Sequence, residues 1–132
     1  MNDERRRVKE LVFRLSDLPS VRDFTAAQAV RAGMTGDSVD DLVLAVNEIA
    51  TNAVTHGTAK AHLRVWVEGG DLVFEIHDEG SGWLPAQPEF TAPGPRSTSG
   101  MGVWLARRLA ADIAFAADRG GTTVTMRFPG RL

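Results

Sequence analysis

The sequence contains no cysteine, which excludes disulfide bonds and metal sites built from thiolates. No apolar run is long enough to cross a bilayer, and residues 1–13 lack the apolar centre of a signal peptide. Neither sign of charge dominates, because the formal net charge is −2, so no strong field attracts nucleic acid or anionic membrane. We therefore expect a cytoplasmic protein that binds neither nucleic acid nor membrane directly.

The sequence does contain enough apolar material for a core. Hydrophobic residues make up 43% of its 132 residues, more than a disordered chain has, and the length fits one domain over residues 1–132. Four of the six prolines fall between Asp78 and Gly100 together with several glycines, and this density opposes both helix and strand. We interpret residues 79–100 as a lid over a functional site, because long loops in small domains are often functional.

Hydrophobic periodicity predicts a β-α-α-β-β-lid-α-β-β order of elements. The expected elements are a strand over Val8–Leu15, a helix from Asp17 to Gly33, a helix over Asp40–Gly57, strands over Ala61–Val67 and Leu72–His77, a helix over Gly102–Ala114, and strands over Ile113–Ala117 and Thr122–Phe128. This order predicts an α/β (α+β) fold, a two-layer sandwich. Its sheet would be mixed and mostly antiparallel, with about five strands and three helices on one face.

The predicted helix over Asp40–Gly57 carries an unusual set of polar residues. Its apolar residues recur at helical spacing, and we expect Ser38 to cap its start. Glu48, Asn52 and His56 are four residues apart, so they form one line along the helix. A solvated face is the usual explanation for such a line, and a buried, hydrogen-bonded histidine is the favoured interpretation of His56.

The segment Asp78-Glu79-Gly80-Ser81-Gly82 directly follows a predicted strand. A carboxylate at Asp78 can accept a hydrogen bond from an exocyclic amine, such as N6 of adenine. Gly80 and Gly82 allow unusual backbone angles and the close approach of a flat ring. The alternative is an ordinary Asp-Gly turn, since the motif alone is a weak signal.

Ser99-Gly100-Met101-Gly102 opens the last predicted helix. Free N–H groups at a helix N-terminus, approached through glycines, can bind an anion such as a triphosphate. The alternative is a flexible hinge capped by Ser99. The sequence has neither the dinucleotide motif G-x-G-x-x-G after a strand nor the P-loop motif G-x-x-x-x-G-K-[ST].

Taken together, these motifs resemble the GHKL (Bergerat-type) ATP-binding fold of gyrase, Hsp90, MutL and histidine kinases. Among these proteins, the chain is most similar to the bacterial anti-sigma factor serine kinases. Their signature E-x-x-T-N-A-x-x-H-G matches residues 48–57, which read EIATNAVTHG. Their S-G-M-G matches Ser99–Gly102, and their G-T-T-V matches Gly121–Val124. The resemblance extends over essentially the whole chain.

The resemblance implies a role for each matching residue. Asn52 would hold the Mg²⁺ that bridges the phosphates of ATP, and Glu48 would be the general base for the attacking hydroxyl. Asp78 would bind adenine, with Gly82 beneath the ring and Thr122 in support. The backbone N–H groups that would bind the phosphates are those of Gly100, Met101 and Gly102.

The resemblance also implies an activity, an ATP-dependent kinase for a serine of a STAS-type anti-anti-sigma protein. The same protein would sequester a sigma factor and form a homodimer. Some relatives carry a basic residue directly before S-G-M-G, where this chain has Thr98, with Arg96 as the nearest cation. Because phosphoryl transfer needs charge neutralisation, a non-catalytic ATP-binding interaction module is the second hypothesis.

A third hypothesis is the catalytic domain of a histidine kinase or of another larger regulator. It ranks lower, because the sequence shows no pair of phosphoacceptor helices. Arg107 and Arg108 follow the glycine motif, and we expect both side chains to be solvated.

Overall fold

A computed structural model of the chain describes residues 7–57, 60–80, 104, 106–118 and 120–129. Within them the strands are β1 (Lys9–Arg14), β2 (Lys60–Glu68), β3 (Asp71–Asp78), β4 (Asp112–Asp118) and β5 (Gly121–Pro129). They form one sheet in the order β1-β2-β3-β5-β4, and every neighbouring pair is antiparallel. The expectation of a mixed sheet is therefore wrong for these strands, because β5 runs opposite to both of its neighbours.

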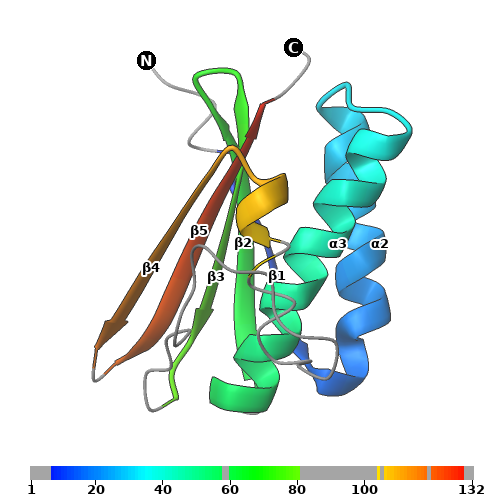
Figure 1. Cartoon of the computed structure of the whole chain (residues 1–132). Helices are drawn as coiled ribbons and strands as arrows, with labels where there is room; N and C mark the ends of the chain where they lie inside the picture. The colour runs from blue at the N-terminus through cyan, green and yellow to red at the C-terminus, as the bar shows by residue number, and fades with distance from the viewer. Residues whose placement is uncertain (1–6, 58–59, 81–103, 105, 119, 130–132) are drawn as a thin grey trace.

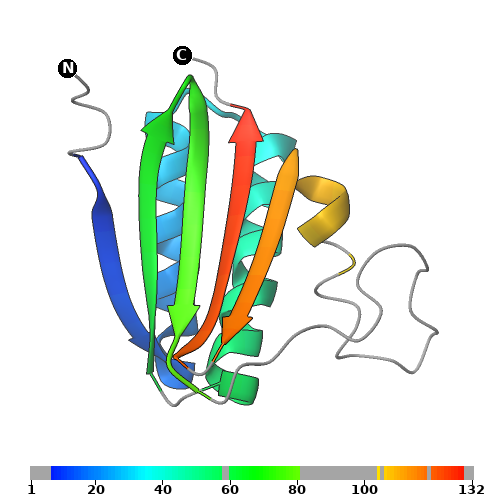
Figure 2. The same ribbon diagram turned by 90° about the vertical axis from the view of Figure 1, so that its left-hand side faces the viewer.

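The long helices α2 (Leu18–Arg31) and α3 (Asp37–Asn52) lie side by side on one face of this sheet (Figure 1). A short helical turn over residues 106–109 lies on the same face of the sheet, and its Ala106 belongs to the same buried core as residues of α2 and α3. Figure 2 shows the sheet from its other side, with the helices behind it. The predicted two-layer architecture is confirmed. None of the described helices is long and apolar enough to cross a membrane.

The chain between β1 and α2 makes a short 3-10 turn over Leu15–Asp17. The Asp17 carboxylate accepts a hydrogen bond from the Arg14 backbone N–H at 3.0 Å, and Pro19 follows in the first turn of α2. The helix therefore begins where the sequence predicts. The strand ends one residue early, however, and Leu15 is 56% exposed instead of sharing the buried face.

The central helix begins earlier than predicted. Helix α3 starts at Asp37, and its cap is Gly36 rather than Ser38. Gly36 has φ of +53°, a conformation that favours glycine, and it turns the chain into the helix. The two carboxylates of the first turn, Asp37 and Asp40, lie at the positive end of the helix dipole, which stabilises this earlier start.

The helix after the lid is shorter than predicted. The backbone N–H of Ala111 already donates to the Arg127 carbonyl of β5 at 2.9 Å, and β4 starts at Asp112. The expected helix over Gly102–Ala114 is therefore wrong for its last five residues, because the helical turn ends at Leu109. Ile113 and Phe115 pack against the core from the strand, so the strand buries apolar side chains that a longer helix would also have buried.

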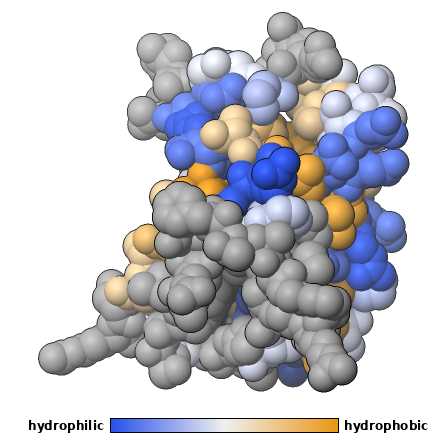
Figure 3. All heavy atoms as spheres, viewed as in Figure 1, coloured by the Kyte–Doolittle hydropathy of each residue, from blue (hydrophilic) through white to orange (hydrophobic). Residues whose placement is uncertain are grey.

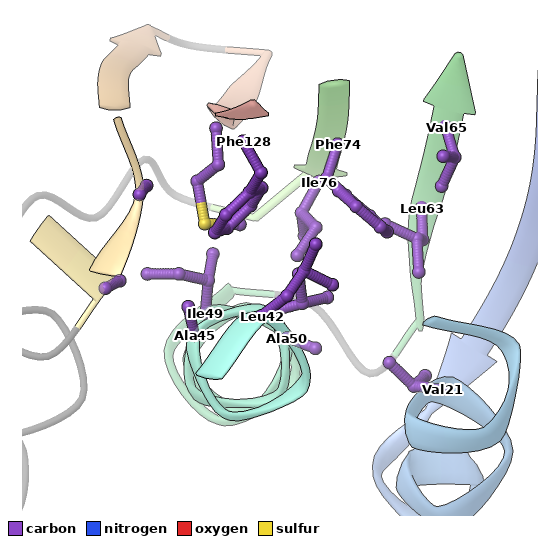
Figure 4. Packing of buried hydrophobic residues seen from close by; sticks show 14 of the residues in the cluster. Val21, Leu42, Ala45, Ile49, Ala50, Leu63, Val65, Phe74, Ile76 and Phe128 are labelled. Carbon is purple, nitrogen blue, oxygen red and sulfur yellow. The ribbon is translucent and has the colours of Figure 1, made fainter. Parts of the chain in front are cut away.

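Apolar side chains of α3 and the sheet fill the space between the two layers (Figure 4). From α3, Leu42, Ile49 and Ala50 point toward the sheet, where Phe74 and Phe128 pack edge to face with ring centroids 5.9 Å apart. In Figure 3, apolar residues show in the seam between sheet and helices, whereas the helix flank is largely hydrophilic. This packing fixes the rotation of α3, and with it the direction of the side chains near its C-terminal end.

Candidate functional site

The C-terminal half of α3 presents two of the predicted site residues. Asn52 is buried, with 9% of its surface exposed, and Glu48 is half-buried one turn earlier, about 6 Å along the axis. In the part of the chain that the structure describes, no hydrogen bond or ion pair engages the Glu48 carboxylate. The neighbouring Asn47 side chain is instead the one that accepts a bond, from Arg22 at 3.3 Å.

The helix widens just beyond Asn52. The chain continues as a π-helical turn over Ala53–Gly57, a feature that is frequent at functional sites. Two threonine side chains bond back to the helix here: the Thr51 hydroxyl donates to the Asn47 carbonyl at 2.7 Å, and the Thr55 hydroxyl donates to the Thr51 carbonyl at 2.8 Å. Such bonds to the carbonyl four residues earlier often bend a helix, which fits the change in helix geometry beyond Asn52.

Asp78 lies at the end of β3 and points into the interior. It is 1% exposed, and one of its carboxylate oxygens accepts the backbone N–H of Gly80 at 2.9 Å. Thr122 of β5 is its cross-strand partner and is equally buried, so both side chains share the inner face of the sheet. A buried carboxylate is costly unless it is hydrogen-bonded, and here the turn at Gly80 supplies such a bond.

At Gly121, the backbone at the start of β5 lies very close to the backbone at the end of β3. This residue has φ of +124°, and a Cβ atom placed on it would lie 2.7 Å from the Asp78 carbonyl carbon and 2.8 Å from Glu79 Cα. Only glycine fits such an approach without a backbone shift. Gly121 thereby sets the position of Asp78, a role that the sequence analysis missed because the residue reads as part of an ordinary turn.

The two halves of the site lie at the same end of the molecule. The C-terminal end of α3, the end of β3 and the start of β5 come together at the bottom of both ribbon views (Figures 1 and 2). The π-helical turn also contacts both β3 and β5. The C-terminal end of α3, which carries Asn52, thus lies at the same end of the sheet as Asp78 and Thr122.

Several predicted site residues lie outside the described residues. They are Gly82, Ser99, Gly100, Met101 and Gly102, together with Thr98 and the rest of the expected lid from residue 81 to residue 100. The side chain of His56 is also outside the description, although its backbone belongs to the π-helical turn. The roles proposed for these residues stay predictions.

Arg107 and Arg108, which follow the glycine motif, differ in the exposure of their side chains. Arg108 is exposed, as expected, and its guanidinium lies over the Trp104 ring. Arg107 was expected to be solvated, and this is wrong: it is half-buried, with its guanidinium 5.2 Å from the centre of the Phe115 ring. Its Nε atom is buried and has no hydrogen-bond partner among the described residues. Apolar packing of the long side chain against β4 explains this burial.

Comparison with known proteins agrees with this geometry. Residues 11–128 match the family described as histidine kinase-like ATPase domain. The chain is 30% identical over 117 residues to the serine-protein kinase RsbW of Bacillus licheniformis, covering 78% of this chain and 72% of the relative. It is 28% identical to the anti-sigma F factor of Clostridium acetobutylicum, covering 70% and 71% of the two chains.

Solved structures show the same fold. The structure of the RsbU and RsbW domains of a Mycobacterium tuberculosis protein superposes with a TM-score of 0.69 at 18% identity, covering 93% of this chain. This chain spans 32% of that longer protein. The mycobacterial sensor histidine kinase MprB superposes with a TM-score of 0.54 at 19% identity, covering 93% and 99%.

Proposed function

The chain belongs to the histidine kinase-like ATPase domain family, and from this membership we propose that it is an ATP-dependent protein-serine kinase of the anti-sigma factor type. Its substrate would be a serine of a STAS-type anti-anti-sigma protein, and it would sequester a sigma factor. The observation that carries the proposal is the pairing of buried Asp78 with Thr122 beside the α3 end that bears Glu48 and Asn52.

The described residues fit a nucleotide with its metal. Asn52 offers a single amide oxygen at the end of α3, which suits Mg²⁺ because this ion keeps several waters and takes further ligands from phosphates. When bound, Mg²⁺ neutralises charge on the phosphates. Asp78 would accept a hydrogen bond from the adenine amine, supported by Thr122, and Gly80 holds the Asp78 carboxylate in position.

Glu48 would act as the general base in this scheme. Its carboxylate is half-buried on the same helix as Asn52 and is not engaged by the described residues, so it can take the proton of the attacking serine hydroxyl. The remaining phosphate contacts would come from the backbone of Gly100, Met101 and Gly102, with residues 79–100 as the lid of a single domain. Location in the cytoplasm and assembly as a homodimer complete the proposal.

A binding experiment tests the adenine site. Asp78→Asn should lower the affinity for ATP by about 10- to 100-fold, because it removes a charged acceptor while its amide oxygen can still accept the Gly80 N–H. Isothermal titration with ATP and Mg²⁺ measures the loss.

Two neighbouring threonines provide the matched control for this experiment. Thr122→Val should also weaken ATP binding, since Thr122 faces the interior beside Asp78. Thr123→Val should not, because Thr123 lies on the other face of the sheet, where its hydroxyl is 2.8 Å from a ring nitrogen of His77. Unchanged affinity in Asp78→Asn, or equal losses in the two threonine variants, would contradict the proposed site.

Thr98 supports a second candidate, a module that binds ATP and a partner without turnover. Incubation of the wild-type protein with labelled ATP and a STAS-domain antagonist distinguishes the kinase from the non-catalytic module. Transfer of the γ-phosphate to the antagonist supports the kinase, whereas tight ATP binding without transfer supports the module.

A further inference from the structure

The face of the sheet away from the helices carries a groove that the proposed kinase does not use. Figure 2 looks onto this face, across β1, β2 and β3. Asp78 and Thr122 point to the opposite face, so the groove and the nucleotide site lie on different sides of the sheet. The groove has a volume of about 750 Å³ and is lined by Val8, Glu10, Arg64, Trp66, Glu68 and Glu75.

An apolar strip forms the floor of the groove. Trp66 of β2 lies opposite Val73 of β3, and Val73 is only 1% exposed although it belongs to the uncovered face. Val8 extends the strip beyond the start of β1 and is 44% exposed. The Trp66 indole N–H donates to Glu68 at 3.0 Å, so this ring is held in one orientation. An ordered, partly exposed tryptophan is typical of binding hot spots.

Carboxylates flank the apolar strip on both sides. Glu10 and Glu75 lie on one side, where Arg64 is between them at 3.4 and 3.8 Å. Glu68 and Asp71 lie on the other side, and their ion-pair partner is Arg127, at 3.3 and 3.5 Å. Among the described residues that line the groove, the three carboxylates of Glu10, Glu68 and Glu75 face a single guanidinium group, that of Arg64, so the lining carries an excess of negative charge. The His62 ring is a further partner of Glu10, at 3.2 Å.

One of the carboxylates beside the apolar strip, Glu10, has a lowered pKa. The hydrogen bond with the His62 ring, and then the contacts with Arg64, hold the pKa of Glu10 below its usual value. An incoming cation would meet carboxylates that are already oriented by their partners.

We propose that this groove binds a basic amphipathic helix of a partner protein. The apolar stripe of such a helix would lie across the strands on Val8 and Trp66, and lysine or arginine side chains on its flanks would reach the carboxylates. The dimensions agree, because strands are about 4.8 Å apart and successive turns of a helix about 5.4 Å. The indole ring also offers a face to a cation.

Other occupants fit this charge pattern less well. A second copy of the chain would bring the same negative groove against itself in a twofold arrangement, which is repulsive. The chain's own residues 1–6 contain Asp3 and Glu4 as well as Arg5 and Arg6, so their side chains carry no net positive charge. A partner with an excess of lysine or arginine remains the best match.

A model peptide tests the proposal on the full chain. An amphipathic helical peptide of leucine and lysine should bind to the wild-type protein, and its leucine–glutamate counterpart should not. Trp66→Ala should lower the affinity for the lysine peptide by about tenfold, since truncation of a central hot-spot residue typically costs that much or more. Titration calorimetry gives the affinities, and amide NMR shifts should map the peptide to β1, β2 and β3.

The chain offers matched controls. Val12→Ala removes an apolar side chain that is 45% exposed on the same face outside the groove, and it should leave binding unchanged. Trp66→Phe keeps most of the apolar area of the side chain. It replaces Trp66→Ala as the test variant if the alanine variant does not fold. ATP binding should be equal in all of these variants, so failure here is distinguishable from failure of the proposed kinase.

Three results would overturn the proposal. Equal binding of the leucine–glutamate peptide would show that charge does not select the occupant. A wild-type dimer that Trp66→Ala dissociates would assign the groove to a second copy. Binding that occurs only after residues 1–6 are removed would assign it to the chain's own N-terminal segment.

Discussion

Glu48→Gln should lower the rate of γ-phosphate transfer to a STAS-domain antagonist by about 10²- to 10⁴-fold, the usual contribution of a general base. Affinity for ATP should stay the same, because the proposed nucleotide contacts are made by Asn52, Asp78 and the glycines. Glutamine keeps the size of the side chain, and Glu48 has no hydrogen bond or ion pair among the described residues that the change would break. Initial rates with labelled ATP at saturating nucleotide measure the effect.

Asp41→Asn is the matched control for this measurement. It also removes one carboxylate from α3, but Asp41 is exposed and lies two turns before Glu48. The control should transfer phosphate at the wild-type rate. If both variants transfer equally fast, Glu48 is not the base, although the proposed ATP site would be unaffected.

Gly121→Ala should lower the free energy of unfolding by about 2–6 kcal/mol. Part of this loss is the strain of a side chain at φ of +124°, about 1–3 kcal/mol. The rest comes from the new methyl group, which would overlap with the backbone of Asp78 and Glu79 and force β3 and β5 apart, an overpacking that costs about 1–3 kcal/mol. Urea unfolding followed by circular dichroism gives the difference.

Gly70→Ala separates the two contributions. Gly70 also has positive φ, +85°, but a Cβ atom there would meet nothing within 4 Å. This variant should therefore show strain alone, at about 1–3 kcal/mol. Equal losses at the two glycines would mean that the close approach of Gly121 to Asp78 contributes nothing. Reduced ATP affinity in refolded Gly121→Ala protein would further link this approach to the site.

The parts of the fold that follow from local pattern were predictable. Strands β2 and β3 alternate clearly and are joined by Gly69-Gly70, so the hairpin appears at the predicted place. The C-terminal end of the helix expected over Gly102–Ala114 was not predictable in the same way. Ile113 satisfies both a helical and an alternating pattern, and the pairing of β4 with β5, the next strand along the chain, decides between them.

The placement of the candidate site residues was predictable to a similar extent. The alignment of Glu48 and Asn52 on one helix follows from their spacing, and the position of Asp78 from its place after a strand, whereas the roles of these residues stay predictions. The pairing of Asp78 with Thr122, and the contact that Gly121 makes there, depend on a register between strands more than forty residues apart along the chain. No local pattern encodes such a register, because it results from the packing of the whole sheet.

The strand order has a consequence for biosynthesis. Strand β5 is the last in sequence but lies between β3 and β4, so two of the four strand pairings wait for it. A ribosome-bound chain that ends before residue 121 leaves β3 with one open edge and β4 with no neighbour. Such a chain would expose the apolar inner side of β3 and offer unpaired strand edges to aggregation or to chaperones. The proposed nucleotide site, which includes Thr122 of β5, can therefore become complete only after this strand has been synthesised.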